Sequence, residues 1–435
     1  MKPSHFLGAL GALLCPVGAV MAQNTPAPKP AAPKPPVPKK APATAEKVDP
    51  KLAQIRDFIS AIRNGETNKV RQFLATKTID VNVADRNGST ALMQAAAAGW
   101  VDICGLLIDA GANVNARDKD QFSPLLIAAY SGHEPVTALL IARGADREAR
   151  DNKGHTALMA AAFSRQAPVM KLLLGFKPDT KARDKAGFGA LTVAAGANNL
   201  ENVRLLLEAG ADANETSIAG FTPLMQASAS RTPEIVRLLI DKGAKVNATA
   251  DKGSTPLLVA AYADRTETVK HLLGRGADAK ARNALGHTPL LGAAFRGNVE
   301  VAGMLLGRGA LIDAPTEAGI TPLMQASYAG QTGIVRLLLN RGADFSARTR
   351  TNLTATMQAA SMGHEEVVKL LLQAGVDINE TDDSRQTALR WAQKRNQEEV
   401  AALLLSAGAK EIEPLPLNAP PPKAEDTADN SERSE

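Results

Sequence analysis

Short apolar stretches recur along this chain at a constant interval of 33 residues. Each interval holds an Ala-rich stretch, as in 223–229, followed by a stretch with apolar residues at helical spacing, as in 235–240. Thr222 and Pro223 are residue types that begin helices, and Gly243 is typical of a position just after a helix end. The pattern therefore predicts pairs of short helices, and the small Ala residues let neighbouring pairs approach closely.

The repeats keep one register without an insertion. A leucine in the motif Ala/Pro-Leu-x-x-Ala recurs at Leu92, Leu125, Leu158, Leu191, Leu224, Leu257, Leu290 and Leu323, and the register continues through Thr356 to Leu389 and back to Ile59. We therefore count eleven repeats, of which the first and last are the most polar. Each repeat can bury its faces only against its neighbours, so stability is local and the polar end repeats serve as caps.

This period, with Thr-Pro-Leu at 222–224, 255–257, 288–290 and 321–323, resembles the ankyrin-repeat family. The resemblance covers residues 51–410. It implies an all-α fold, an ankyrin-repeat solenoid of helix-turn-helix units joined by β-hairpin-like turns. It also implies a protein-binding module, because ankyrin-like proteins bind other proteins.

Residues 1–22 are predicted to be a signal peptide cleaved after Ala22. Lys2 precedes a short apolar run, and small residues stand before the cleavage point. The run is too short and too interrupted by Gly and Pro to span a membrane. A lipid anchor on Cys15 is the competing interpretation, but Leu14 stands where a small residue would be expected. We expect a periplasmic or secreted protein.

Two further segments lack the repeat pattern. Residues 23–50 are rich in Pro, Ala and Lys and are predicted to be an extended, disordered linker. It acts either as a spacer or as a Lys-rich arm that touches the cell wall or an anionic surface. Residues 411–435 are rich in Pro, Glu and Asp and are predicted to be an acidic disordered tail.

Composition and motifs give little sign of chemistry. Aromatic residues make up 3% of the 435 residues, the formal net charge is +5, and no basic stripe interleaved with aromatics points to nucleic acid. No P-loop, HExxH or GxSxG motif occurs. His155 and His287 share a repeat position but lie four repeats apart, too far to share a metal. We expect no enzymatic activity, no cofactor, no metal and no small-molecule substrate.

The capped ends of the array favour a monomer. Cys104 stands where other repeats have Val, and its side chain is expected to be buried.

Aromatic residues gather at two positions of the repeat. The first holds Tyr130, Phe163, Tyr262, Phe295 and Tyr328, and the second holds Phe122, Phe188, Phe221 and Ile320. The resemblance places both on the concave face, which implies a ladder of aromatics and a binding surface for a protein partner. The alternative is packing, in which each ring covers the Ala-rich neighbouring repeat. Variation at the first position, with Gly196 and Ala229 in other repeats, favours binding.

Arginines form a row at one hairpin position: Arg117, Arg150, Arg183, Arg282 and Arg348. They either pair with acidic groups of the partner or form a solvated row of charges.

Several repeats depart from the pattern. Arg165, Asn198, Arg231 and Asp264 replace the Gly of the inter-helix turn, and Lys177 replaces a helix-ending Gly. Ordinary residues are strained in the left-handed conformation that Gly adopts there. The repeat at 352–384 also has Thr356 where Leu is usual. We therefore expect lower local stability around 163–200 and in 352–384.

These observations predict a non-catalytic scaffold of the cell envelope that binds an unidentified protein through its concave face. One alternative is an inhibitor or immunity-type protein that neutralises a single enzyme or toxin. The other is an envelope-associated structural protein that uses the Lys-rich linker. Tight binding of one partner at fixed stoichiometry would favour the first alternative. Loss of envelope retention on deletion of residues 24–50 would favour the second.

Overall fold

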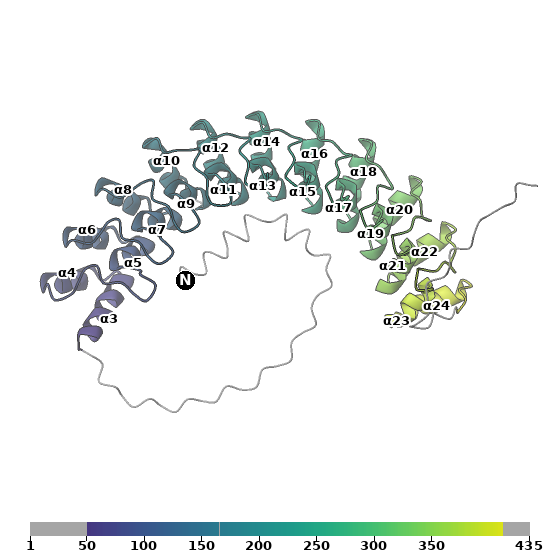
Figure 1. Ribbon diagram of the computed structural model, residues 1–435, viewed down its shortest axis with the longest axis horizontal. Helices are drawn as coiled ribbons and strands as arrows, with labels where there is room; N and C mark the ends of the chain where they lie inside the picture. Colours follow the sequence, from purple (N-terminus) through teal and green to yellow (C-terminus); the bar gives the residue numbers. More distant parts are fainter. Residues whose placement is uncertain (1–49, 165, 412–435) are drawn as a thin grey trace, which may run out of the picture. The chain divides into compact units, whose positions relative to one another are not determined.

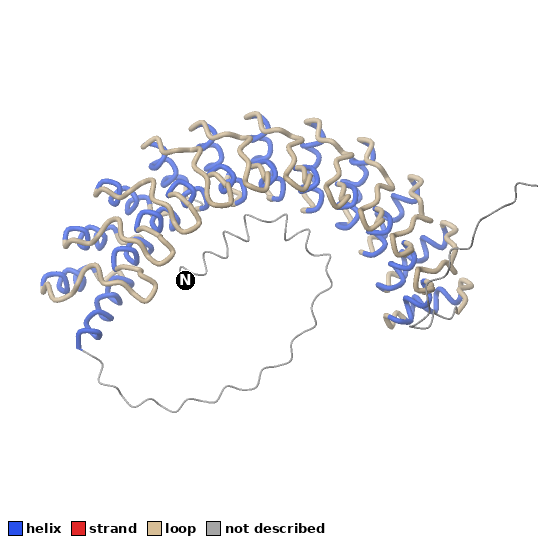
Figure 2. The backbone as a smooth tube through the Cα atoms, viewed as in Figure 1, coloured by secondary structure: helices blue, strands red, loops and turns tan. Residues whose placement is uncertain are grey.

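The computed structural model describes residues 50–164 and 166–411. The predicted signal peptide, almost all of the linker, and residues 412–435 lie outside the described residues. Among the described residues every regular element is a helix, apart from one isolated bridge between Ala84 and Thr90 (Figure 2). The predicted all-α class is confirmed.

The chain divides into two compact units, Met1–Ala284 and Leu285–Glu435. In the described part of the first unit, seven helix pairs stack side by side (Figure 1). The inner helices are α3 (Pro50–Arg63), α5 (Ala91–Ala98), α7 (Pro124–Ser131), α9 (Ala157–Phe163), α11 (Ala190–Gly196), α13 (Pro223–Ala229) and α15 (Pro256–Tyr262). The outer helices are α4 (Thr67–Ala75), α6 (Val101–Asp109), α8 (Glu134–Ala142), α10 (Ala167–Gly175), α12 (Leu200–Glu208), α14 (Pro233–Asp241) and α16 (Thr266–Gly274).

The described part of the second unit holds four further pairs. Its inner helices are α17 (Pro289–Arg296), α19 (Pro322–Tyr328), α21 (Ala355–Met362) and α23 (Ala388–Lys394). Its outer helices are α18 (Val299–Gly307), α20 (Thr332–Asn340), α22 (Glu365–Gln373) and α24 (Glu398–Ser406).

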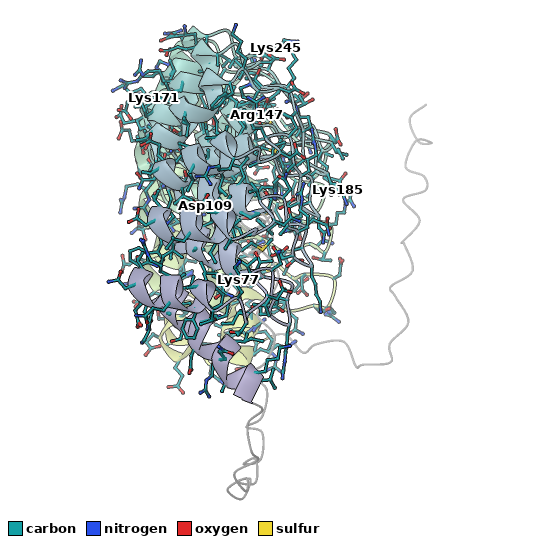
Figure 3. All side chains as sticks on the ribbon, turned by 90° about the vertical axis from the view of Figure 1, so that its left-hand side faces the viewer. Lys77, Asp109, Arg147, Lys171, Lys185 and Lys245 are labelled. Atoms are coloured by element: carbon teal, nitrogen blue, oxygen red, sulfur yellow. The ribbon has the colours of Figure 1, made fainter. Side chains whose placement is uncertain are left out.

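Each unit has two layers of helices and a row of loops. In the view of Figure 3, Lys171, on the outer helix α10, and Lys185, in a hairpin loop, lie on opposite sides of the first unit.

Threonine or serine begins most inner helices. In α13 the Thr222 hydroxyl accepts a hydrogen bond from the main-chain N–H of Met225 at 3.2 Å, and Pro223 follows in the first turn. The same cap recurs at Thr90, Ser123, Thr156, Thr255, Thr288, Thr321, Thr354 and Thr387. Since such a cap contributes about 1 kcal/mol, its repetition fixes where these nine inner helices start.

Asparagine side chains join successive repeats on the loop after the outer helix. The Asn115 amide donates to the carbonyl oxygen of Gly144 at 3.2 Å and accepts from the N–H of Asp146 at 2.8 Å. Asn82, Asn214 and Asn247 make the same pair of bonds. These bonds satisfy backbone groups that the open loop would otherwise leave to water.

The residues that replace glycine in the turns adopt two different backbone conformations. Asn198 and Asp264 adopt positive φ of 61° and 58°, and Lys177 does so at 52°, as the missing glycines predicted. Arg231 does not. There α13 ends at Ala229, and Ser230 after it is extended, with φ −74° and ψ 168°. The predicted left-handed conformation is therefore confirmed for three of these positions and wrong for Arg231, while Arg165 lies outside the described residues.

Candidate protein-interaction surface

The first aromatic position lies at the C-terminal end of the inner helices. In the first unit it brings together Tyr130 on α7 and Phe163 on α9, whose rings stack with centroids 5.2 Å apart and planes 15° from parallel. Both rings are half-buried, and burial raises the pKa of the Tyr130 hydroxyl to about 12. Gly196 and Ala229 hold this position in the next two repeats. The pair therefore presents a partly exposed aromatic surface that stops where small residues begin.

Tyr262 does not extend this surface. Its side chain is only 5% exposed, and burial raises the pKa of its hydroxyl well above the usual range. Phe188, at the second aromatic position, is also buried. The expectation of a continuous exposed ladder is therefore wrong for Tyr262 and Phe188, which pack in the core.

The second unit exposes its aromatics more. Tyr328, at the end of α19, is 44% exposed, and Phe295, at the end of α17, is half-buried beneath the Arg296 guanidinium, 5.7 Å from the ring centroid. Met362, at the end of α21, is 41% exposed. Sequence reasoning missed Met362, because it stands one residue after the aromatic position. Periodicity alone marks only positions that repeat.

The hairpin position that holds Phe122, Phe221 and Ile320 is half-buried. An Asp, Ser or Thr four residues earlier accepts the main-chain N–H of each, as Asp118 does from Phe122 at 2.8 Å. These side chains stand on rigid turns, which lowers the entropy that binding would cost. Their role in binding stays a prediction.

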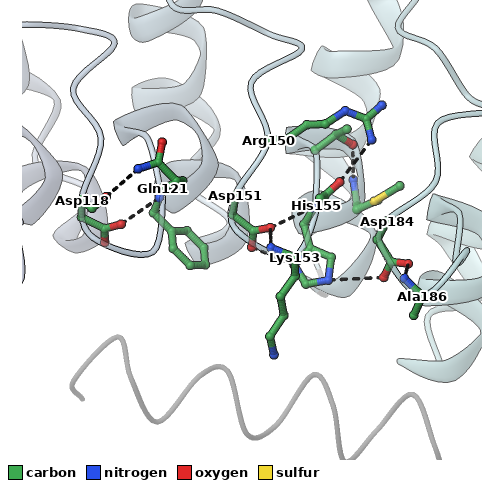
Figure 4. Close-up of polar contacts among 12 residues, drawn as sticks. Asp118, Gln121, Arg150, Asp151, Lys153, His155, Asp184 and Ala186 are labelled. Atoms are coloured by element: carbon green, nitrogen blue, oxygen red, sulfur yellow. Dashed lines mark hydrogen bonds and ion pairs between the residues drawn. The ribbon is translucent and has the colours of Figure 1, made fainter.

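His155 occupies this same hairpin position and forms a buried charge cluster (Figure 4). Its Nδ1 lies 2.8 Å from Asp151 Oδ2, and its Nε2 lies 3.5 Å from Asp184 Oδ2 in the next hairpin. Burial opposes protonation, but the bonds and charges of the two carboxylates outweigh it and raise the pKa of His155 to about 9. The imidazolium therefore joins two successive hairpins at neutral pH. The signal in the sequence was a histidine at a position where the two neighbouring repeats have Phe122 and Phe188.

The arginine row is used inside the array. Arg117 donates to the carbonyl oxygen of Arg150 at 3.1 Å, and Arg150 donates to that of Arg183 at 2.7 Å. Arg183 pairs with Glu215 at 3.1 Å, and Arg348 pairs with Glu380 at 2.8 Å. The expectation that this row is solvated or meets acidic partner groups is corrected for these four residues. Their guanidinium groups bind carbonyl or carboxylate oxygens of the following repeat.

Two caps that cross between repeats compensate irregular residues. Gly189 begins α11 without a side-chain cap, and the Glu215 carboxylate of the next repeat accepts the Thr192 N–H at 3.0 Å instead. At the end of α9, the Asn202 amide donates to the carbonyl oxygens of Ala161 and Ser164, both at 3.0 Å. Sequence reasoning missed both caps. The signal was a polar residue where most other repeats hold Ala or an aliphatic side chain.

The remaining chemistry-bearing side chains are dispersed. Cys104 is fully buried, as predicted, and burial raises the pKa of its thiol to about 12. The described part of the chain contains no group of three or more His, Cys, Asp or Glu side chains placed to hold a metal ion. Of the helices in residues 50–164 and 166–411, none combines the length and the apolar character needed to cross a membrane.

Comparison with known proteins agrees with the repeat architecture. A family model described as ankyrin repeats (3 copies) matches overlapping stretches that together run from residue 58 to residue 413. These are 58–151, 115–184, 135–217, 158–250, 191–283, 257–349 and 323–413. No curated protein matches the chain. Ankyrin repeats are in general protein–protein interaction modules. The match spans most of the sequence, and the chain therefore belongs to the ankyrin-repeat family.

Proposed function

We propose that this protein is a non-catalytic scaffold of the cell envelope that binds a partner protein along the ends of its inner helices. The observation that carries the proposal is the stacked pair Tyr130 and Phe163, whose rings are only half-buried, whereas Tyr262 at the same repeat position is buried. Rigid, partly exposed aromatics are frequent anchors of protein interfaces. Tyr328 offers a second anchor in the other unit.

The envelope location is part of the proposal and rests on the export signal predicted at residues 1–22. The absence of a disulfide among the described residues is compatible with it, because the single cysteine there is buried and the repeats hold together by packing.

The test is affinity capture from an envelope extract with the predicted mature chain, residues 23–435, as bait. One variant changes Tyr130 and Phe163 to Ser, and a second changes Tyr328 to Ser. A matched control changes Phe176 and Leu311 to Ser, since these are exposed apolar side chains outside the inner helices. We expect a partner on the native bait and on the control, and at least a tenfold loss, about 1.4 kcal/mol, on one of the two test variants.

Equal capture by all four folded baits would contradict the proposed surface. Fractionation of cells that express the full chain tests the location separately. A protein that stays in the cytoplasm would contradict the envelope assignment and leave the surface proposal standing.

A further inference from the structure

The inner helices of the second unit end in a strip that carries basic charge and no acidic residue. We define the basic strip as residues 295–298, 328–331, 361–364 and 394–397, which are the ends of α17, α19, α21 and α23 and the turns that follow them. Its charged members Arg296, Lys394 and Arg395 are all exposed. The corresponding positions of the first unit hold Arg165, Arg231 and Arg265, but also the acidic residues Glu66 and Asp264. What sets the strip of the second unit apart is therefore that no acidic residue accompanies its basic charge.

Exposed apolar side chains lie between these charges. Tyr328 and Met362 are 44% and 41% exposed. The four inner helices are neighbours in order, α17 beside α19, α19 beside α21 and α21 beside α23. Glu365 and Glu366, which follow the strip at the start of α22, already pair with Lys369 at 2.7 and 2.8 Å. The strip thus has the composition that suits an acidic peptide with some apolar side chains.

The chain itself supplies such a peptide next to the strip. Residues 412–435, the acidic segment, contain six acidic residues against Lys423 and Arg433, and five of the six fall in 425–435. They also contain Ile412, Leu415 and Leu417. The last described residue, Glu411, accepts a hydrogen bond from Gln393 on α23 at 3.1 Å. Gln393 directly precedes Lys394 in the strip, so the segment starts beside the surface that it complements.

We propose that the acidic segment 412–435 docks on the basic strip of its own chain. Its reach is sufficient, because the 14 residues from Glu411 to Glu425 extend to about 45 Å at full stretch, whereas inner helices lie about 10 Å apart.

Each exposed ion pair between the segment and the strip is worth only about 0.2–1 kcal/mol. Tethering raises the effective concentration of the segment to the millimolar range, so that a few weak contacts are enough. Docking covers Tyr328, and a partner of this unit then has to displace the segment.

This proposal goes beyond partner binding and does not depend on it, since docking is measured without any partner. A paramagnetic tag is placed on Ser434→Cys in a Cys15→Ser background of the full chain, where the native Cys104 is buried and stays unlabelled. The methyl signals of the methionines report which side chains the tag approaches. Met362 lies in the strip, and Met304 on the outer helix α18 serves as the internal reference.

We expect the tag to broaden Met362 and to spare Met304 at low ionic strength. The effect should fall about fivefold in 1 M salt, where the screening length drops to about 3 Å. The double variant Lys394→Glu, Arg395→Glu should abolish it. The control Arg336→Glu, Arg341→Glu changes the net charge equally on and after the outer helix α20 and should leave it intact.

Three outcomes would overturn the proposal. The first is a Met362 signal that the tag does not touch, and the second is an equal loss of broadening in both double variants. The third is broadening in a mixture of tagged unlabelled chains with untagged labelled chains, which would assign the docked segment to a second copy.

Discussion

Glu215 accepts the main-chain N–H of Thr192 at 3.0 Å and so caps a helix of the preceding repeat. Nine of the other inner helices in the described part of the chain are capped by their own Thr or Ser, but the residue before α11 is Gly189, which has no side chain to cap it. A Cβ at residue 189 would lie 2.5 Å from Glu215 Oε2. Glycine at 189 therefore leaves the space that the Glu215 carboxylate occupies. Glu215 also pairs with Arg183, which joins hairpin, helix and neighbouring repeat in one buried network.

The contact between Gly189 and Glu215 predicts that substitutions at these two residues affect stability in a non-additive way. Glu215→Ala should lower the free energy of unfolding by about 1–3 kcal/mol, because it removes the cap of α11 and the partner of Arg183. Gly189→Thr alone should also destabilise, since its side chain meets the carboxylate. The double variant restores the usual Thr and Ala and should recover most of the loss. Urea unfolding of the four chains measures this, and additive effects would contradict it.

The His155 cluster predicts a pH dependence of stability. The pKa of His155 is raised from 6.5 to about 9 in the folded protein. Its contribution is therefore fully present below pH 6.5 and is lost as the pH rises through about 9. The loss should be at most about 3 kcal/mol. In His155→Phe, which copies the neighbouring repeats, unfolding free energies between pH 6.5 and 9.5 should change less than in the native chain.

Asn202 should be more stabilising than an aliphatic side chain, although most other repeats have Val or Ile at its position. It is fully buried, and it donates to two carbonyl oxygens at the end of α9 that no glycine turn caps. Asn202→Val should cost about 0.5–1.5 kcal/mol, because each carbonyl loses one donor and keeps another, the Ser164 hydroxyl on Ala161 and the Asn199 amide on Ser164. Thr268→Val, at the same position two repeats later, is the matched control and should be neutral or stabilising. Equal effects of both changes on the urea midpoint would refute the cap.

Burial separates the aromatics into two groups. Tyr262→Ser should lower the free energy of unfolding by about 3 kcal/mol or more, since it empties a buried site. Tyr328→Ser removes a ring that is 44% exposed and should cost well under half of that. Thermal unfolding compares the two. A larger loss for Tyr328 would mean that its ring packs in the core and is no anchor for a partner.

The irregular glycine positions predict opposite responses to the same substitution. Lys177→Gly should stabilise by about 0.5–1 kcal/mol, because residue 177 has a φ of 52° that glycine adopts without strain. Arg231→Gly should destabilise, since the turn at 231 avoids positive φ and glycine only adds entropy to the unfolded chain. Hydrogen exchange of the amides of α10 and α14 should show the two changes locally. Increased protection in both would contradict this account.

The sequence alone determined the fold, because one 33-residue pattern of apolar, small and helix-capping residues repeats in register and each copy meets only its neighbours. It also predicted the buried Cys104 and the positive φ of Lys177, Asn198 and Asp264, since these follow from position within the repeat.

Only the tertiary structure decided which aromatics are exposed, that Arg117 and Arg150 bind the next repeat, and that Glu215 and Asn202 cap helices of an earlier one. These outcomes depend on which side chains face each other across a repeat boundary. A period read along one chain gives each position its average environment, whereas the partner across the boundary differs from repeat to repeat.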